Sequence, residues 1–278
     1  MRTLKLAISP CPNDTFIFDA LLHKKVDTEG LDFELVFADI EQLNQATFNA
    51  QYDITKLSYH AYAYASESYI LLRSGSALGN NCGPLLISKK ALSDEEVAQA
   101  KICIPGKYTT ANLLFSLKYP SAKQKKFIVF SEIENKVLQD EFDAGVIIHE
   151  NRFTYDEKGL QKIIDLGEYW ETTYQSPIPL GGIAIRRSID VETQLAVERI
   201  IKRSIEFAFD YPDSSKEFVA QHAQEMSAEV CQQHIQLYVN KFSVALGFDG
   251  ELAVNTLYKI AREKEIIPEI NQPFFIEA

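Results

Sequence analysis

The chain has 278 residues, enough for one large domain or two modest ones, and 46% of them are hydrophobic, as in an ordinary globular protein with a packed core. Its 28 Lys and Arg residues against 39 Asp and Glu residues give a formal net charge of −11 at pH 7. This negative charge repels a polyanion, so we expect no nucleic-acid partner, although local backbone dipoles can still attract a small anion.

No apolar run approaches the length of a membrane span, and residues 4–8 are too short for the core of a signal peptide. We therefore expect a cytoplasmic protein without a membrane partner. The cysteines are scattered, without Cys-x-x-Cys spacing, so we expect neither a disulfide framework nor a bound metal. They are Cys11, Cys82, Cys103 and Cys231.

Strand patterns alternate with helix signals from the start of the chain. Residues 4–8 favour a strand, and residues 13–14 (Asn-Asp) offer a cap for a helix after it. Residues 31–37 alternate between apolar and polar side chains, which predicts a second strand. Residues 39–42 then read as a capping box, the signature of a helix start.

The same order continues downstream. Residues 93–96 and 131–134 read as capping boxes, each followed by a short helix and then a strand, at 102–104 and 145–148. Beyond residue 190 the pattern is helical, with two apolar stripes, the first of which ends before Pro212. Strands that alternate with helices predict an α/β fold with a largely parallel sheet or sheets. The stripes consist of Val197, Ile201, Ile205 and Ala208, and of Ala253, Leu257 and Ile260.

Four predicted strand ends run into polar or glycine-containing loops. Because open α/β sheets bind ligands outside the carboxyl ends of their strands, we expect the ligand site at these loops. They are residues 9–15, 55–58 (after a strand at 52–54), 105–110 and 149–152.

Residues 105–110 form the best candidate anion site among these loops. Free backbone N–H groups at a helix start, with the hydroxyls of Thr109 and Thr110 nearby, suit a carboxylate or a phosphate. Lys101 stands where a nucleotide-binding P-loop needs its first glycine, so that motif is excluded. The alternative is an ordinary threonine N-cap beside a solvated lysine.

His149 is the candidate general base, because it ends an apolar strand and histidine titrates near neutral pH. The alternative is a histidine that only hydrogen-bonds a strand end. His149-Glu150 lacks the second histidine of a zinc-protease motif. His60 adjoins the loop 55–58 and stays open as a second candidate, whereas the other histidines read as structural: His23, His222 and His234.

Two further clusters are assigned to structure. The tyrosines at residues 59–69 are expected to pack against the neighbouring sheet rather than stack on a ligand. Glycines recur every fourth residue between 75 and 83, which indicates a mobile turn or a close backbone approach beside a hinge.

Four motifs together resemble the 1,4-dihydroxy-6-naphthoate synthases of the futalosine route to menaquinone, over nearly the whole chain. They are Ser-Pro-Cys-Pro-Asn-Asp-Thr-Phe (9–16), Thr-Lys-Leu-Ser-Tyr (55–59), Ser-Gly-Ser-Ala-Leu-Gly (74–79) and Ile-Ile-His-Glu-Asn-Arg-Phe-Thr-Tyr (147–155). The resemblance implies two α/β lobes, as in type-2 periplasmic binding proteins, with a cleft between them. Two crossover strands would join the lobes, at 83–89 and 181–186, so that residues 1–88 and 182–278 form one lobe and residues 89–181 the other.

The resemblance also implies the reaction. A lyase of this family converts cyclic dehypoxanthine futalosine, a small carboxylate, to 1,4-dihydroxy-6-naphthoate and releases the sugar-derived fragment, without a cofactor or a metal. The family's proton acceptor falls on His149. Its substrate contacts fall on Lys56, Leu57, Ser58, Thr109 and Thr110, and additional cleft positions fall on Pro12, Asn13 and Asp14.

Two alternatives remain at this point. The fold alone also fits a non-catalytic binding or sensing protein for a small carboxylate. A chorismate dehydratase of the same pathway shares the fold, although the Thr-Lys-Leu-Ser and Ile-His-Glu motifs favour the naphthoate synthase. The oligomeric state and the roles of Lys56, His60 and residues 75–83 are open.

Overall fold

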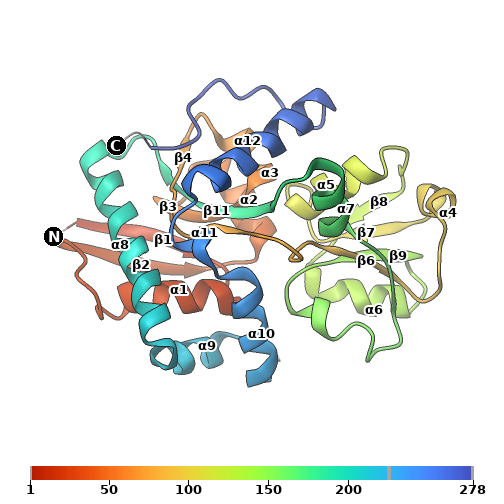
Figure 1. Ribbon diagram of the computed structural model, residues 1–278, viewed down its shortest axis with the longest axis horizontal. Helices are drawn as coiled ribbons and strands as arrows, with labels where there is room; N and C mark the ends of the chain where they lie inside the picture. The colour runs from red at the N-terminus through yellow and green to blue at the C-terminus, as the bar shows by residue number, and fades with distance from the viewer. Residues whose placement is uncertain (1, 224–226, 277–278) are drawn as a thin grey trace.

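The computed structural model describes residues 2–223 and 227–276, which fold into two α/β lobes side by side (Figure 1). The strands are β1 (Arg2–Ile8), β2 (Leu31–Phe37), β3 (Ile54–Ser58), β4 (Tyr69–Leu71), β5 (Ala77–Gly79), β6 (Leu85–Ser88), β7 (Ile102–Ile104), β8 (Lys125–Phe127), β9 (Ala144–Ile147), β10 (Gln161–Asp165) and β11 (Ile178–Arg186). The helices are α1 (Pro12–Leu22), α2 (Ile40–Thr47), α3 (Tyr59–Ala65), α4 (Asp94–Gln99), α5 (Thr110–Lys118), α6 (Ile133–Leu138), α7 (Leu166–Tyr174), α8 (Val191–Asp210), α9 (Lys216–His222), α10 (Ala228–Tyr238), α11 (Lys241–Val244) and α12 (Gly247–Glu263). Short 3₁₀ turns cover Phe130–Glu132, His149–Phe153 and Pro212–Ser215.

Each lobe is built on one sheet. The first has the order β2-β1-β3-β11-β4, with β5 also paired to β11, and the second has the order β10-β6-β9-β7-β8. Both sheets are mixed rather than parallel throughout. β1 runs parallel to β2 and β3, and β7 parallel to β8 and β9, whereas β11, β6 and β10 pair antiparallel. The antiparallel strands include β6 and β11, each of which enters its sheet from the other lobe (Figure 1).

The strand pairing moves both predicted lobe boundaries. Leu85–Ser88 pairs with β9 and β10, so this segment lies in the second sheet and not in the lobe that was predicted to end at residue 88. Ile178–Gly181 pairs with β5 and β3, so it lies in the first sheet and not in the lobe predicted to end at residue 181. Backbone hydrogen bonding therefore puts the two connections near residues 80–84 and 175–177. Hinge movement about them stays a prediction.

Local signals located most helix starts. Asp39 and Ser93 cap α2 and α4 through complete capping boxes, as predicted. The box predicted at residues 131–134 is wrong: a 3₁₀ turn ends at Glu132, α6 starts at Ile133 without a side-chain cap, and the Glu134 carboxylate accepts hydrogen bonds from Asn151 and Lys158. The stripe on α8 is buried, and that helix stops at Asp210, as predicted.

The start of α1 also differs from the prediction. Pro12 opens the helix after Cys11, and no side chain caps it. Proline is suited to the first helical position because its missing N–H would have no partner there. Asn13 and Asp14 therefore lie inside the first turn, and their side chains are available for contacts with other elements.

The loop predicted at residues 55–58 is part of the central strand β3, which is buried along its whole length. β3 pairs with β1 on one side and with β11 on the other. One apolar core lies under α1 and α8, and another continues from α3 of the first lobe to α5 of the second. Three of the predicted tyrosines pack in this second core, as expected: Tyr59, Tyr62 and Tyr69. Within the described residues, no helix has the length and apolar character needed to cross a membrane.

Candidate active site

A cavity of about 660 Å³, its open mouth included, lies between the two sheets. Concave sites between two parts of a fold are a usual place for a small organic ligand. The first lobe contributes to its wall residues from the end of β1, the start of α1 and β3: Ser9, Asn13, Asp14, Lys56 and Ser58. The second lobe contributes the start of α5 and the segment after β9: Thr109, Thr110, Ala111, Ile148 and His149.

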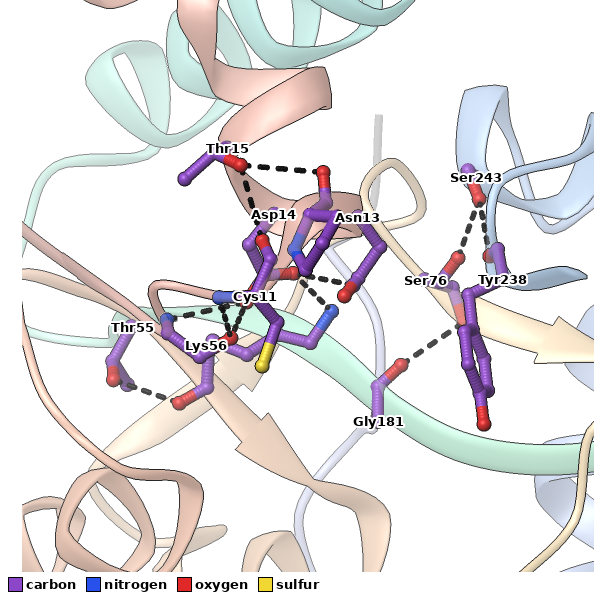
Figure 2. Close-up of polar contacts among 12 residues, drawn as sticks. Cys11, Asn13, Asp14, Thr15, Thr55, Lys56, Ser76, Gly181, Tyr238 and Ser243 are labelled. Carbon is purple, nitrogen blue, oxygen red and sulfur yellow. Dashed lines mark hydrogen bonds and ion pairs between the residues drawn. The ribbon is translucent and has the colours of Figure 1, made fainter. Parts of the chain in front are cut away.

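A buried ion pair stands at one side of this cavity. The Lys56 ammonium on β3 donates to Asp14 Oδ1 at 2.9 Å, and both side chains are nearly or fully inaccessible to solvent (Figure 2). The other oxygen of Asp14 accepts from the Ser9 hydroxyl at 2.7 Å and from the Ser9 backbone N–H at 3.2 Å. Removing one partner would leave a buried charge uncompensated, which costs about 3–5 kcal/mol in proteins.

The ion pair extends through Asn13 to a second histidine. Asn13 donates its amide N–H to Asp14 Oδ1 at 2.8 Å, so its amide oxygen is the atom that faces His234 Nε2 at 2.9 Å. Because that oxygen can only accept, His234 Nε2 carries the proton. A neutral imidazole has one N–H, so His234 Nδ1 is an acceptor.

His149 follows β9 and opens a 3₁₀ turn with a φ of 58°, in the left-handed region that few non-glycine residues adopt. Its Nδ1 lies 3.7 Å from the sulfur of Cys11 at the start of α1, so the contact joins the two lobes. The ring packs edge-on against Phe130 at 5.1 Å and nearly parallel to His234, with 5.9 Å between ring centroids.

The surroundings of His149 keep its imidazole neutral. The pKa of His149 is lowered to about 4, mainly by burial; the Asp14 carboxylate opposes this shift and Lys56 adds to it. A neutral imidazole can accept a proton at physiological pH. The negative charge of Asp14 favours the imidazolium that such a transfer would form.

The predicted anion loop is partly occupied by a side chain of the protein itself. The Glu41 carboxylate on α2 accepts the backbone N–H groups of Lys107 at 3.0 Å and Tyr108 at 3.1 Å. Burial raises the pKa of Glu41. Two of the backbone N–H groups predicted to bind a ligand, those of Lys107 and Tyr108, therefore join the lobes instead. The first turn of α5 remains at the cavity wall.

The two threonines of this loop line the cavity, with their hydroxyl protons directed to backbone carbonyls. Thr109 caps α5 by accepting from Asn112 N–H, and donates to the carbonyl of Gly106 at 2.9 Å. Thr110 donates to the carbonyl of Leu180 in β11 at 2.6 Å, which is a further contact between the lobes.

Three other candidates lie away from the cavity wall. Leu57 is buried in the core, and Pro12 is buried at the start of α1. His60 is also buried, and its Nδ1 donates to the carbonyl of Thr109 at 3.0 Å. Burial lowers the pKa of His60 to about 4. The second candidate base therefore lies behind the loop 105–110 and not in the cavity.

His234 is the residue that sequence reasoning missed. It shares one face of α10 with Cys231 and Tyr238, at the spacing of an apolar stripe, and so read as structural. A histidine in an otherwise apolar stripe was the available signal, but its partner Asn13 lies 221 residues away in sequence. In residues 2–223 and 227–276, no group of three His, Cys, Asp or Glu side chains is arranged to hold a metal ion.

Comparison with known proteins agrees with this geometry. A family model described as menaquinone biosynthesis matches residues 4–263. The 1,4-dihydroxy-6-naphthoate synthase of Thermus thermophilus is 39% identical over 276 residues, covering 99% of this chain and 100% of that protein. The synthase of Streptomyces coelicolor is 40% identical over 274 residues, covering 96% of each.

Solved structures support the fold. A protein of Archaeoglobus fulgidus has a TM-score of 0.90 at 36% identity, covering 95% of this chain and 98% of that one. The ligand-binding component of an ABC-type import system from Staphylococcus aureus has a TM-score of 0.72 at 13% identity, covering 100% and 97%, which indicates the fold alone. The chain thus has the two-lobed periplasmic-binding-protein-like fold, and it belongs to the menaquinone-biosynthesis family together with the two 1,4-dihydroxy-6-naphthoate synthases.

Proposed function

We propose that this chain is a 1,4-dihydroxy-6-naphthoate synthase, a lyase of the futalosine route to menaquinone that acts in the cytoplasm. Its substrate would be cyclic dehypoxanthine futalosine. Two synthases of the same name match nearly the full chain at about 40% identity. The observation that carries the proposal is the neutral imidazole of His149 in the cavity between the lobes, beside the Lys56–Asp14 pair.

His149 would act as the general base through Nε2. For this its Nδ1 must carry the proton, with the sulfur of Cys11 at 3.7 Å as a weak acceptor. His149 then takes a proton from a substrate carbon that a neighbouring carbonyl makes acidic. The electron pair of that C–H bond forms the new ring double bond as the C–C bond to the sugar-derived fragment breaks, and the fragment leaves with the C–C electron pair and takes the proton back from the His149 imidazolium. Aromatisation of the ring provides the driving force.

The second lobe would bind the substrate carboxylate. The first turn of a helix leaves N–H groups without partners inside the helix, and its dipole favours an anion. Thr110 and Ala111 of that turn in α5 line the cavity. Ser58 would contact the substrate from the first lobe, and Lys56 would hold the Asp14 carboxylate beside the base through their 2.9 Å hydrogen bond.

Turnover by the purified protein tests the proposal. We expect the protein to convert cyclic dehypoxanthine futalosine, with 1,4-dihydroxy-6-naphthoate followed by its absorbance and the released fragment by mass spectrometry. Chorismate serves as the comparison substrate. Binding of the cyclic compound without product would make the chain a binding protein, and consumption of chorismate alone would make it the dehydratase; either result would overturn the proposal.

A further inference from the structure

His234 has no role in the reaction as described so far, yet it lies directly behind the cavity wall. Its side chain is inaccessible to solvent, and its three polar or aromatic neighbours Asn13, His149 and Tyr238 all line the cavity. α10, which carries it, packs against the 3₁₀ turn that begins at His149. His234 can therefore influence the site without touching the substrate.

The position of this histidine is costly for the fold. Among the described residues, His234 Nδ1 has no hydrogen-bond partner, although it is buried. An unsatisfied buried acceptor destabilises the folded state. A glutamine amide could donate the same hydrogen bond to Asn13, so the bond alone does not explain an imidazole here.

The need to orient the ring of His149 explains the imidazole at position 234 better. Among the side chains that the structure describes, the His149 ring has one hydrogen-bond contact, the long one to the sulfur of Cys11, which fixes an aromatic plane weakly. Packing must therefore set the orientation of that ring. His234 lies nearly parallel to it, with 16° between the planes, and Phe130 meets it at 68°.

The Nε2 atom of His234 acts on the Lys56–Asp14 ion pair. His234 Nε2–H donates to the oxygen of Asn13, which leaves the amide N–H of Asn13 for Asp14 Oδ1, the oxygen that also accepts from Lys56. Without that donor, the Asn13 amide could rotate and present its oxygen to the carboxylate. The orientation of Asp14 beside the base therefore depends on His234.

We propose that His234 is a positioning residue for the general base: its ring fixes the plane of His149, and its Nε2–H fixes the Asp14 carboxylate through Asn13. The inference rests on the proposed function, since it assigns His149 the role of base. The charged or titratable groups described near His234 are His149 from the 3₁₀ turn, Lys56 from β3 and Tyr238 from its own helix, and Asp14 of α1 is linked to it through Asn13.

A neutral His234 is part of this role. Burial lowers the pKa of His234 well below its usual value, and His149 and Lys56 lower it further. A second imidazolium here would repel the one that forms on His149 during proton transfer.

Two substitutions separate the two contacts. His234→Gln keeps an N–H near the place of Nε2 but removes the ring, whereas His234→Phe keeps a ring but removes the donor. We expect each to lower kcat at least about tenfold, since displacing a reacting group by about 1 Å can cost roughly 10²-fold, and to leave KM within about threefold. His222→Gln on α9 is the matched control and should behave as wild type.

A spectroscopic measurement keeps the inference testable apart from turnover. In long-range ¹H–¹⁵N spectra, wild-type His234 should show the Nε2–H tautomer, and the titration midpoint of His149 should move in both variants. Wild-type kcat and an unmoved His149 midpoint in a folded His234→Gln protein would overturn the proposal. If the wild-type protein itself makes no naphthoate, the proposed function fails. The contact between the His234 and His149 rings is then judged by the spectra alone, and an unmoved His149 midpoint in the His234 variants would reject it.

Discussion

At the scale of single residues, His149 combines an unusual backbone conformation with an unusual pKa. It has a left-handed φ of 58°, a long sulfur contact and a pKa lowered to about 4 by burial. Backbone strain of this kind persists where surrounding structure requires it, and it is often found at functional sites. Its neutral ring and its position in the cavity are what a general base requires.

Replacing His149 by asparagine tests that role. Asparagine tolerates a positive φ and places a polar atom where Nδ1 meets Cys11, so the fold should be kept. It has no atom at the position of Nε2, so it cannot take the proton. We expect kcat to fall at least about 10²-fold, within the usual range for a lost general base, with little change in Kd. Turnover assays with wild-type and variant enzyme measure kcat, and calorimetry measures Kd. Near wild-type turnover would exclude His149 as the base.

Thr110 offers a second test at this scale. Its hydroxyl bonds the carbonyl of Leu180 in the other lobe at 2.6 Å, next to the α5 turn proposed to bind the carboxylate. Thr110→Val removes the hydroxyl at nearly constant volume, and Thr110→Ser keeps it. We expect KM to rise roughly 2- to 12-fold for valine, as for a lost hydrogen bond of about 0.5–1.5 kcal/mol, and to stay near wild type for serine. Equal KM values for the two variants would argue against the assignment.

At the scale of elements, local patterns predicted what local forces decide. The strand at 31–37 and the helix caps at Asp39 and Ser93 depend on near neighbours, and the structure has them as predicted. The sequence predicts a polar loop at residues 55–58 after a strand at 52–54, whereas the structure has these residues in β3. The strand tolerates Lys56 because Asp14, 42 residues earlier, pairs with it.

The candidate site also combines features that the local sequence predicts with features that depend on residues far apart in the chain. His149 and the α5 turn could be found from the ends of predicted strands, because that rule depends on topology alone. The Asn13–His234 bond and the Glu41 contact with residues 107–108 join segments far apart in sequence, so no spacing reveals them. Their discovery required the packed structure.

A close approach between two backbones gives a prediction at this scale. A Cβ atom added to Gly83, just before β6, would lie 2.3 Å from the backbone of Gly167 in α7. Because both partners are backbone, neither can move aside without shifting a strand or a helix. We expect Gly83→Ala to lower the free energy of unfolding by about 1–3 kcal/mol, as overpacking does. Gly79→Ala, where an added Cβ would lie 3.1 Å from the Asn240 side chain rather than against backbone, should cost less in the same urea titration; an equal cost would contradict this interpretation of the contact.

At the scale of the whole molecule, contacts between the lobes define this conformation as closed. Glu41 binds the backbone of Lys107, Thr110 binds that of Leu180, and Cys11 meets His149. We predict that the free protein opens about the two connections and that 1,4-dihydroxy-6-naphthoate closes it, as in other hinged two-lobed proteins. The radius of gyration from X-ray scattering should then fall on adding the product, and the bound profile should match this structure. Identical profiles with and without product would contradict hinge closure.

The buried histidines make the stability of the whole protein depend on pH. Burial lowers the pKa of His60 and of His149 to about 4, against 6.5 for an exposed histidine. Between pH 6.5 and 4 the unfolded chain therefore binds more protons than the folded one, so the free energy of unfolding falls as the pH falls through this window. Above pH 6.5 both states are neutral at these positions, and the effect disappears.

His60 allows that dependence to be measured at one site outside the cavity. His60→Asn keeps an N–H near the place of Nδ1, where His60 donates to Thr109, but it cannot be protonated. Of the stability that the wild type loses between pH 7 and pH 4, roughly 3 kcal/mol should be absent in the variant, from about 1.36 kcal/mol for each pH unit between the two pKa values. Urea unfolding at four pH values across the window measures the difference, with His222→Asn as the control. If the two proteins lose stability in parallel, His60 is protonated in the folded state as readily as in the unfolded chain, and its burial does not have the electrostatic effect described here.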